Sequence, residues 1–288
     1  MLGLKSVSSA AISPDGKYAA YTVIVPRTFD EKPGGSYSEL HIIDLKTKVS
    51  GPFIIGKENI SSIAWSPDGS EIAFRMRRGE KAKSQVWSIP LSGGEARQLT
   101  DCKSGVSAFA WHPSGKQIAY IATEPETKRE KTLEDKGYGF IYFEEYLKHK
   151  NLYLVDVLPD SQNANATQLT SDVTVWSFVF SEDGKKIALA ATEKNLIDYS
   201  YMFKHVHLLD VATKEIKQLT QNPGKLGNFK FSPDGKQLAY TAALETKDHA
   251  VSQVYVMPVK GGEAKNLTKA NFRGHVHWVN WKDNNTII

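Results

Sequence analysis

Two neighbouring carboxylates are the side chains of this 288-residue chain with the clearest capacity to bind a ligand. Glu144 and Glu145 lie in an aromatic stretch of a long insertion at 124–150. Adjacent carboxylates between aromatic walls could hold the free ammonium group of a peptide through charge-assisted hydrogen bonds. The alternative is structural, because on a helix Glu144 would pair with Lys148 and Glu145 with His149 at the i,i+4 spacing. The sequence leaves both interpretations open.

Other catalytic or metal-binding patterns are missing or incomplete. The chain has no Gly-x-Ser-x-Gly nucleophile motif, phosphate loop, dinucleotide fingerprint or Cys-x-x-Cys pair. We therefore predict no catalytic residue and no cofactor within it. Two His-x-His pairs, His205/His207 and His275/His277, would each place both rings on one face of a strand. A zinc site needs three or four ligands, and no third is evident, so we expect ordinary strand residues and no metal.

A repeated turn sequence indicates the strands that position these residues. An aromatic or branched residue precedes Ser-Pro-Asp-Gly or a degraded copy of it, and an alternating apolar strand follows. The copies are ISPDGK at 12–17, WSPDG at 65–69, WHPSGK at 111–116, FSEDGK at 180–185, FSPDGK at 231–236 and a trace, WKDNN, at 281–285. Proline and aspartate favour the turn, and glycine accepts a positive φ. The aspartates are therefore interpreted as turn formers, and the interval of roughly 50 residues favours propeller blades.

Each repeat continues with a third strand, a tight turn and a short fourth strand, which is the composition of a propeller blade. The fourth strands read RQLT at 97–100, TQLT at 167–170, KQLT at 217–220 and KNLT at 265–268. We predict an all-β propeller domain over 1–288, with five complete four-stranded blades and the start of a sixth. The blades fall at about 6–56, 60–100, 106–170, 174–220, 227–268 and 275–288. Because the sixth stops within its second strand, we infer a truncated propeller from a longer protein.

The long insertion of the third blade has two parts. Its charged part, 128–136, has no apolar period, and we expect it to be exposed. Its aromatic part, 138–150, places Phe143, Tyr146 and Leu147 at helical spacing, so we expect a short helix or an aromatic flap there.

Composition narrows the function classes. The net charge is only +4 and dispersed, which argues against a nucleic-acid partner. No stretch approaches the roughly 18 apolar residues of a membrane span. One cysteine excludes an internal disulfide. These features are typical of a soluble protein, and the compartment stays open between the cytoplasm and, if a leader was removed, the periplasm or the exterior.

The repeats resemble the PD40 or TolB-type propeller unit, and three segments make the resemblance more specific. LKSVSSAAISPDGK at 4–17, GSYSEL at 35–40 and DYSYMF at 198–203 look like the N-terminal propeller of prolyl-oligopeptidase-family (S9) serine peptidases. The acylaminoacyl-peptidase and dipeptidyl-peptidase 5 branch is the most similar. The resemblance covers essentially the whole chain.

The resemblance implies a partner and a role. In this family a C-terminal α/β-hydrolase domain of the same polypeptide carries a Ser-Asp-His triad, and the propeller restricts access to short peptide substrates. Residues 1–288 lack that triad, so this chain would be non-catalytic alone. In dipeptidyl peptidases paired glutamates of a propeller insertion hold the substrate amine, which implies that role for Glu144 and Glu145. The alternative is a TolB-like, non-enzymatic interaction propeller, and assembly into a homo-oligomer stays open.

Overall fold

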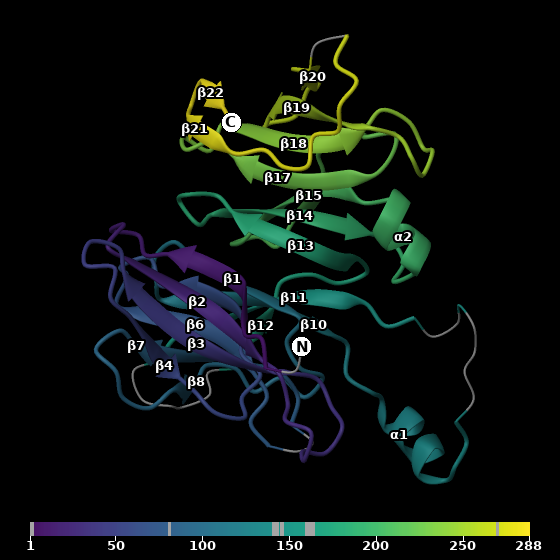
Figure 1. Ribbon diagram of the computed structural model, residues 1–288. Helices are drawn as coiled ribbons and strands as arrows, with labels where there is room; N and C mark the ends of the chain where they lie inside the picture. The colour runs from purple at the N-terminus through teal and green to yellow at the C-terminus, as the bar shows by residue number, and fades with distance from the viewer. Residues whose placement is uncertain (1–2, 80–81, 140–143, 145–146, 159–164, 269–270) are drawn as a thin grey trace. The chain divides into compact units, whose positions relative to one another are not determined.

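The computed structural model describes residues 3–79, 82–139, 144, 147–158, 165–268 and 271–288. The described chain forms antiparallel four-stranded sheets, each of which follows the order of the sequence (Figure 1). The first contains β1 (Ser6–Ile12), β2 (Tyr18–Val25), β3 (Tyr37–Asp44) and β4 (Ser50–Ile54). The second contains β5 (Ser61–Trp65), β6 (Glu71–Met76), β7 (Gln85–Pro90) and β8 (Arg97–Gln98).

Three further four-stranded sheets and one two-stranded sheet follow. The third sheet contains β9 (Ala108–Trp111), β10 (Gln117–Thr123), β11 (Lys150–Asp156) and β12 (Thr167–Gln168). The fourth contains β13 (Thr174–Phe180), β14 (Lys186–Thr192), β15 (His205–Asp210) and β16 (Ile216–Gln218). The fifth contains β17 (Leu226–Phe231), β18 (Gln237–Ala243), β19 (Ser252–Pro258) and β20 (Lys265–Asn266). The last pairs β21 (Trp281–Asp283) with β22 (Thr286–Ile287). The prediction of four-stranded blades with the start of a sixth is confirmed.

The repeated turn has the same geometry in the blades with Ser-x-Asp-Gly. In the first blade the Ser13 hydroxyl donates to Asp15 Oδ1 at 2.7 Å, and the Lys17 amide donates to the same oxygen at 3.0 Å. These bonds lower the pKa of Asp15 to about 2. Gly16 takes a φ of 70°, which a residue with a Cβ adopts at a cost. The serine-to-aspartate bond measures 2.7 Å in three later blades as well, so the aspartates stabilise turns.

The threonine of the fourth-strand motif also has a repeated structural role. Its hydroxyl accepts the amide of the second or third residue of the third strand in four blades, and the distance is 2.9 Å in each. The threonines are Thr100, Thr170, Thr220 and Thr268. The threonine thus gives a partner to a third-strand amide beyond the end of the short fourth strand, as a main-chain donor inside a sheet requires.

A bulge recurs near the beginning of the first strand of a blade. The pairing register shifts by one or more residues between Val7 and Ser9 in β1 and between Ser61 and Ala64 in β5. The same irregularity lies between Val175 and Ser177 in β13, and β17 is also irregular near its start. A bulge changes the direction in which side chains point. The bulges therefore allow these four blades to present different side chains at the same end of their sheets.

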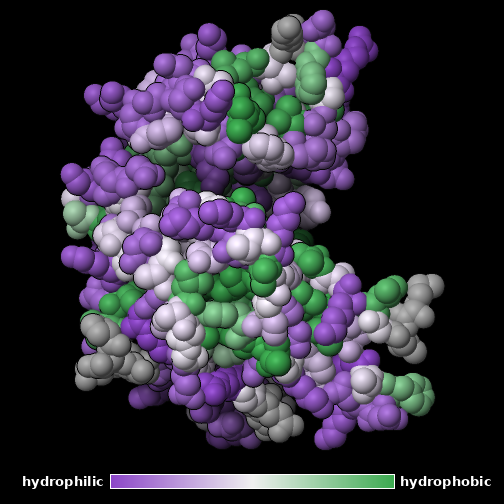
Figure 2. Space-filling model, turned by 60° about the vertical axis from the view of Figure 1, so that its left-hand side comes forward, coloured by the Kyte–Doolittle hydropathy of each residue, from purple (hydrophilic) through white to green (hydrophobic). Residues whose placement is uncertain are grey.

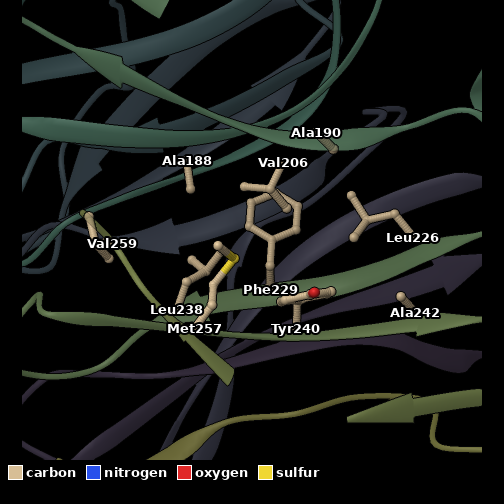
Figure 3. Close-up of a cluster of buried hydrophobic side chains, with 10 residues drawn as sticks. All are labelled: Ala188, Ala190, Val206, Leu226, Phe229, Leu238, Tyr240, Ala242, Met257 and Val259. Atoms are coloured by element: carbon tan, nitrogen blue, oxygen red, sulfur yellow. The ribbon is translucent and has the colours of Figure 1, made fainter. Parts of the chain in front are cut away.

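The chain divides into two compact units. Unit 1 comprises 1–122 and 154–167, and unit 2 comprises 123–153 and 168–288. In unit 1 a core forms around Phe74, Leu40 and Ile72, which are fully buried. In unit 2 apolar side chains of β13–β16 and β17–β20 face one another, and Phe229 points toward Val206 (Figure 3). In β14 and β18 every residue after the first is buried, so successive residues on both faces of these strands belong to the core.

Two short helices lie outside the sheets: α1 (Lys128–Asp135) and α2 (Ile197–Met202). Neither buries a residue. Figure 2 shows hydrophilic side chains over much of one face of the molecule, with apolar patches between them. Within the described residues no helix has the length and apolar character needed to cross a bilayer.

Candidate substrate-binding site in the third-blade insertion

The charged part of the insertion forms a helix, which the sequence analysis did not predict. Thr127 caps α1: its side chain accepts the Glu130 amide at 3.2 Å, and the Glu130 carboxylate accepts the Thr127 amide at 2.6 Å. This capping box compensates for the missing apolar face. Its Thr-x-x-Glu spacing was present in the sequence and could have revealed the helix. The prediction that this part is exposed agrees with a helix that buries no side chain.

For the aromatic part we expected a short helix or an aromatic flap, and the described residues bear only on the helix. Residues 140–143, 145 and 146 lie outside the described residues, and Glu145 is among them. Glu144 is exposed and has a φ of 58°, which is not a helical value. Residues 147–149 are irregular, and β11 begins at Lys150. A helix that extends through Lys150 is therefore wrong, because the chain there enters a strand.

The ion pair that we considered for Glu144 is replaced by another. Lys148 Nζ lies 3.1 Å from Glu130 Oε2, so the lysine connects the insertion to the capped end of α1. The Thr127 amide and side chain, followed by Lys148, lower the pKa of Glu130 to about 2. The structural explanation for Glu144 through Lys148 is thus removed. Its proposed role as an amine ligand, together with Glu145, stays a prediction.

Glu124 fixes the point where the insertion returns to the sheet. One carboxylate oxygen accepts the His149 amide at 3.1 Å, and the other accepts the Asn151 side chain at 3.2 Å. The His149 ring is 2.9 Å from the Thr174 hydroxyl at the start of β13. The insertion is therefore attached at its base to its own blade and to the next one. The role of Glu124 is not evident from the sequence, since its partners are 25 and 27 residues away.

The insertion also contacts the equivalent loop of the fourth blade. Asn195, which lies two residues before α2 begins, donates its side-chain amide to the Lys148 carbonyl at 2.8 Å. Lys150 Nζ lies 4.0 Å from the centre of the Trp176 ring, and burial lowers the pKa of this lysine. A cation over an indole face is a stabilising arrangement. Two loops that connect second and third strands are thus joined at one end of unit 2.

Helix α2 adds exposed aromatic surface at this end. Tyr199 and Phe203 pack edge to face with ring centres 5.3 Å apart. Tyr201 is 59% exposed, and Lys225 Nζ lies 5.2 Å from the centre of its ring. Carboxylates, lysines and aromatic rings therefore all occur at this end of unit 2. Such a surface can bind the charged ends and the apolar side chains of a short peptide.

The histidine pairs do not assemble a metal site in the described part of the chain. The His275 and His277 ring centres are 4.7 Å apart, and His205 Nδ1 lies 3.1 Å from Asn222 Oδ1. Burial lowers the pKa of His207, which favours its neutral form. No group of three or more His, Cys, Asp or Glu side chains suited to a metal occurs among the described residues.

The sheets define the class of protein: a β-propeller whose blades carry inserted loops between their second and third strands. Residues 181–280 match the model of the dipeptidyl peptidase IV (DPP IV) N-terminal region. The chain is 30% identical over 258 residues to the uncharacterized peptidase YuxL of Bacillus subtilis, covering 88% of this chain and 32% of that protein. It is 29% identical over 302 residues to dipeptidyl-peptidase 5 of Porphyromonas gingivalis, covering 96% of this chain and 43% of that protein.

Solved structures agree on the fold. The Pyrococcus horikoshii acylaminoacyl peptidase aligns with a TM-score of 0.69 at 15% identity, over 99% of this chain and 42% of that one. The β-propeller domain of the Trilobed protease from Pyrococcus furiosus aligns with a TM-score of 0.58 at 19% identity, over 92% of this chain and 71% of that one. A putative TolB from Agrobacterium tumefaciens aligns with a TM-score of 0.59 at 19% identity, over 92% of this chain and 81% of that one. The resemblance to the N-terminal propeller of S9 peptidases and to TolB-type propellers is confirmed. The chain spans less than half the length of the two curated relatives.

Proposed function

We propose that this chain is the substrate-gating propeller of a serine exopeptidase that acts on short peptides, of the dipeptidyl- or acylaminoacyl-peptidase type. The similarity to dipeptidyl-peptidase 5 over 96% of the chain is the observation that carries this proposal. The sequence has no nucleophile motif of its own. Catalysis would therefore belong to a C-terminal α/β-hydrolase domain of the same polypeptide. There a serine hydroxyl would attack the scissile carbonyl, the amine of the cleaved amide bond would leave with a proton, and water would hydrolyse the acyl-serine ester to regenerate the serine.

The propeller would contribute selection of the substrate. A peptide has to reach the serine past the blades, so short or unfolded chains pass and folded proteins do not. The third-blade insertion would recognise the peptide at its amino end. In this proposal Glu144 and Glu145 accept hydrogen bonds from the free ammonium group, and neighbouring aromatic side chains contact the first side chains of the peptide. An acylated peptide has no ammonium group, so an acylaminoacyl peptidase would not need these carboxylates.

The parent reading frame provides the first test. We expect it to continue beyond the codon for Ile288 with the rest of the propeller and then with Gly-x-Ser-x-Gly, Asp and His in that order. The full-length protein should hydrolyse dipeptide p-nitroanilides and lose this activity after treatment with a serine-directed fluorophosphonate. Residues 1–288 alone should be inactive. A full-length protein without a nucleophile motif and without hydrolysis would exclude the peptidase proposal.

The amine-binding role is tested separately in the full-length protein. Replacing Glu144 and Glu145 by glutamine keeps their shape and removes both charges. If they hold the ammonium group, kcat/KM for free-amine dipeptide substrates should fall well beyond threefold, and N-acetylated substrates should be little affected. A change below about threefold, equivalent to about 0.7 kcal/mol, would contradict the role. Glu134→Gln on the exposed face of α1 is the matched control.

The second candidate is a TolB-like interaction propeller without an enzyme. The structural similarity to TolB proteins favours it, at a TM-score of 0.59. It requires a parent chain that completes the ring of blades and then ends. The same reading frame therefore separates the two candidates.

A further inference from the structure

A cavity in unit 1 has a chemistry that the proposed amine site does not explain. It has a volume of about 820 Å³ and lies at the end of the first two blades where their second strands finish. Arginine and hydroxyl side chains dominate its lining: Arg27, Arg75 and Arg77 occur together with seven serines and Thr22. Among the described residues, no acidic side chain lines it. A cavity with this lining is suited to an oxyanion.

The repeat itself shows that two of these arginines are exceptions. Counted from the turn glycine, the sixth residue of successive blades is Thr22, Arg75, Ile121, Ala190 and Thr241. The eighth residue is Ile24, Arg77, Thr123, Thr192 and Ala243. The first, third, fourth and fifth blades thus all have uncharged side chains at both positions of the second strand. The blade fold does not require arginine here, so the charges call for another explanation.

Arg75 is held in place by its own contacts. Its Nε donates to the Ser62 hydroxyl at 3.1 Å, and its Nη1 donates to the backbone carbonyls of Val106, at 3.0 Å, and Ser107. These bonds orient the guanidinium without neutralising it. Burial, followed by the repulsion of Arg77, lowers the pKa of Arg75. Among the described residues neither arginine forms an ion pair with a carboxylate.

The bulges supply the hydroxyl groups. Ser62, in the bulge of β5, has a φ of 54°, which is uncommon for a residue with a side chain and is found where surrounding contacts enforce it. Next to the bulge of β1, the hydroxyls of Ser8 and Ser9 each lie 2.7 Å from that of Thr22. Both bulges therefore present hydroxyl groups to the same cavity as the arginines.

We propose that this cavity binds a carboxylate of a peptide, with Arg77 and the free donors of Arg75 as the charged ligands and the serine hydroxyls as neutral donors. A guanidinium binds a carboxylate through paired hydrogen bonds of matching geometry. The choice of a peptide carboxylate over other oxyanions rests on the proposed function, while the oxyanion site rests on the cavity alone. The carboxylate could belong to the peptide's C-terminus or to an acidic side chain.

Isothermal titration calorimetry on residues 1–288 at low ionic strength tests the proposal without catalysis. Four probes are compared: N-acetyl-Ala-Ala with a free carboxylate, its C-terminal amide, N-acetyl-Asp-Ala amide, and inorganic phosphate. We expect at least one carboxylate peptide to bind tenfold or more tightly than the neutral amide, and the peptide that does so identifies the source of the carboxylate. Equal binding of the neutral amide, or tighter binding of phosphate, would overturn the peptide-carboxylate proposal.

Matched variants locate the binding. Arg77→Gln alters an exposed side chain outside the strands and should weaken the carboxylate peptide tenfold or more. Arg78→Gln makes the same charge change on the neighbouring residue, which does not line this cavity, and should leave the affinity within about twofold. Equal losses in both variants would show nonspecific charge attraction and refute the site. Since peptidase activity is not measured, failure here leaves the proposed function intact, and the loss of that function would leave the measured binding intact.

Discussion

In both units the second strand of a blade ends, and the third begins, at the same end of the sheet, but different side chains gather there. Unit 1 presents the half-buried Arg75, the exposed Arg77 and a group of serines around an open cavity. Unit 2 presents Glu124, Glu130 and exposed aromatic rings on two inserted loops. The shared blade thus provides a scaffold whose strand ends accept opposite charges, because turns and cores are formed elsewhere in the repeat.

The two ends also differ in how they are held. Arg75 connects blades through bonds to backbone carbonyls, whereas α1 depends on its own cap and buries no residue. We therefore expect changes in unit 1 to affect global stability and changes in α1 to stay local.

The largest effect should come from the cores. Phe74→Ala in unit 1 and Phe229→Ala in unit 2 each remove a buried ring and should cost about 3–5 kcal/mol of unfolding free energy. We propose that the chain is one propeller domain, so both variants should lower the midpoint of a single unfolding transition in urea. Two separate transitions, each sensitive to only one variant, would show that the units unfold independently.

Arg75→Ala should have the next largest effect. It removes donors to the Val106 and Ser107 carbonyls and should lower the unfolding free energy by about 2 kcal/mol. Arg77→Ala at the exposed neighbour should change the unfolding free energy by no more than about 0.5 kcal/mol. Chemical denaturation of both variants measures the difference. If the Arg77 variant were as unstable as the Arg75 variant, the structural role assigned to Arg75 would be wrong.

Thr127→Ala should act locally. It removes the side-chain acceptor of the capping box and should destabilise α1 by about 1 kcal/mol. Faster amide hydrogen exchange should be confined to α1, with the midpoint of global unfolding unchanged. Thr132→Ala on the same helix leaves the cap intact and serves as the control. A clear shift of the global midpoint would mean that α1 is part of the stable core.

The smallest effect concerns pH. Because the pKa of Glu130 is lowered from 4.5 to about 2, its bonds stabilise the native state fully above about pH 4.5. That contribution should disappear as the pH falls from 4.5 through 2, since the folded carboxylate is then protonated. Nuclear magnetic resonance of the Glu130 side chain should give a midpoint near 2. Thr127→Ala keeps the backbone amide, which is the largest cause of the lowered pKa, and removes the side-chain contribution, so the midpoint should rise only part of the way toward 4.5. An unchanged midpoint would contradict the contribution assigned to the Thr127 side chain.

The sequence alone determined the repeated parts of this protein. Ser-Pro-Asp-Gly turns, alternating strands and Gln-Leu-Thr segments identify blades because their partners lie within a few residues or in the adjacent strand. Asp15, for example, is bonded to residues two positions away on either side. The capping box of α1 is equally local, and its signal was present in Thr127 and Glu130, but the prediction for this part rested on the absence of an apolar period alone.

The tertiary structure decided which side chains meet between blades. Glu124 accepts the His149 amide, Lys150 lies over the Trp176 ring, and Arg75 donates to the Val106 carbonyl. These partners are distant in the sequence, and the repeat pattern does not predict them. The bulge that turns Ser62 toward Arg75 is also a property of strand pairing. A repeat predicts its own fold because local contacts are the same in every copy. The chemistry of the strand ends arises where one copy departs from the others, and only the folded sheets show what each departure faces.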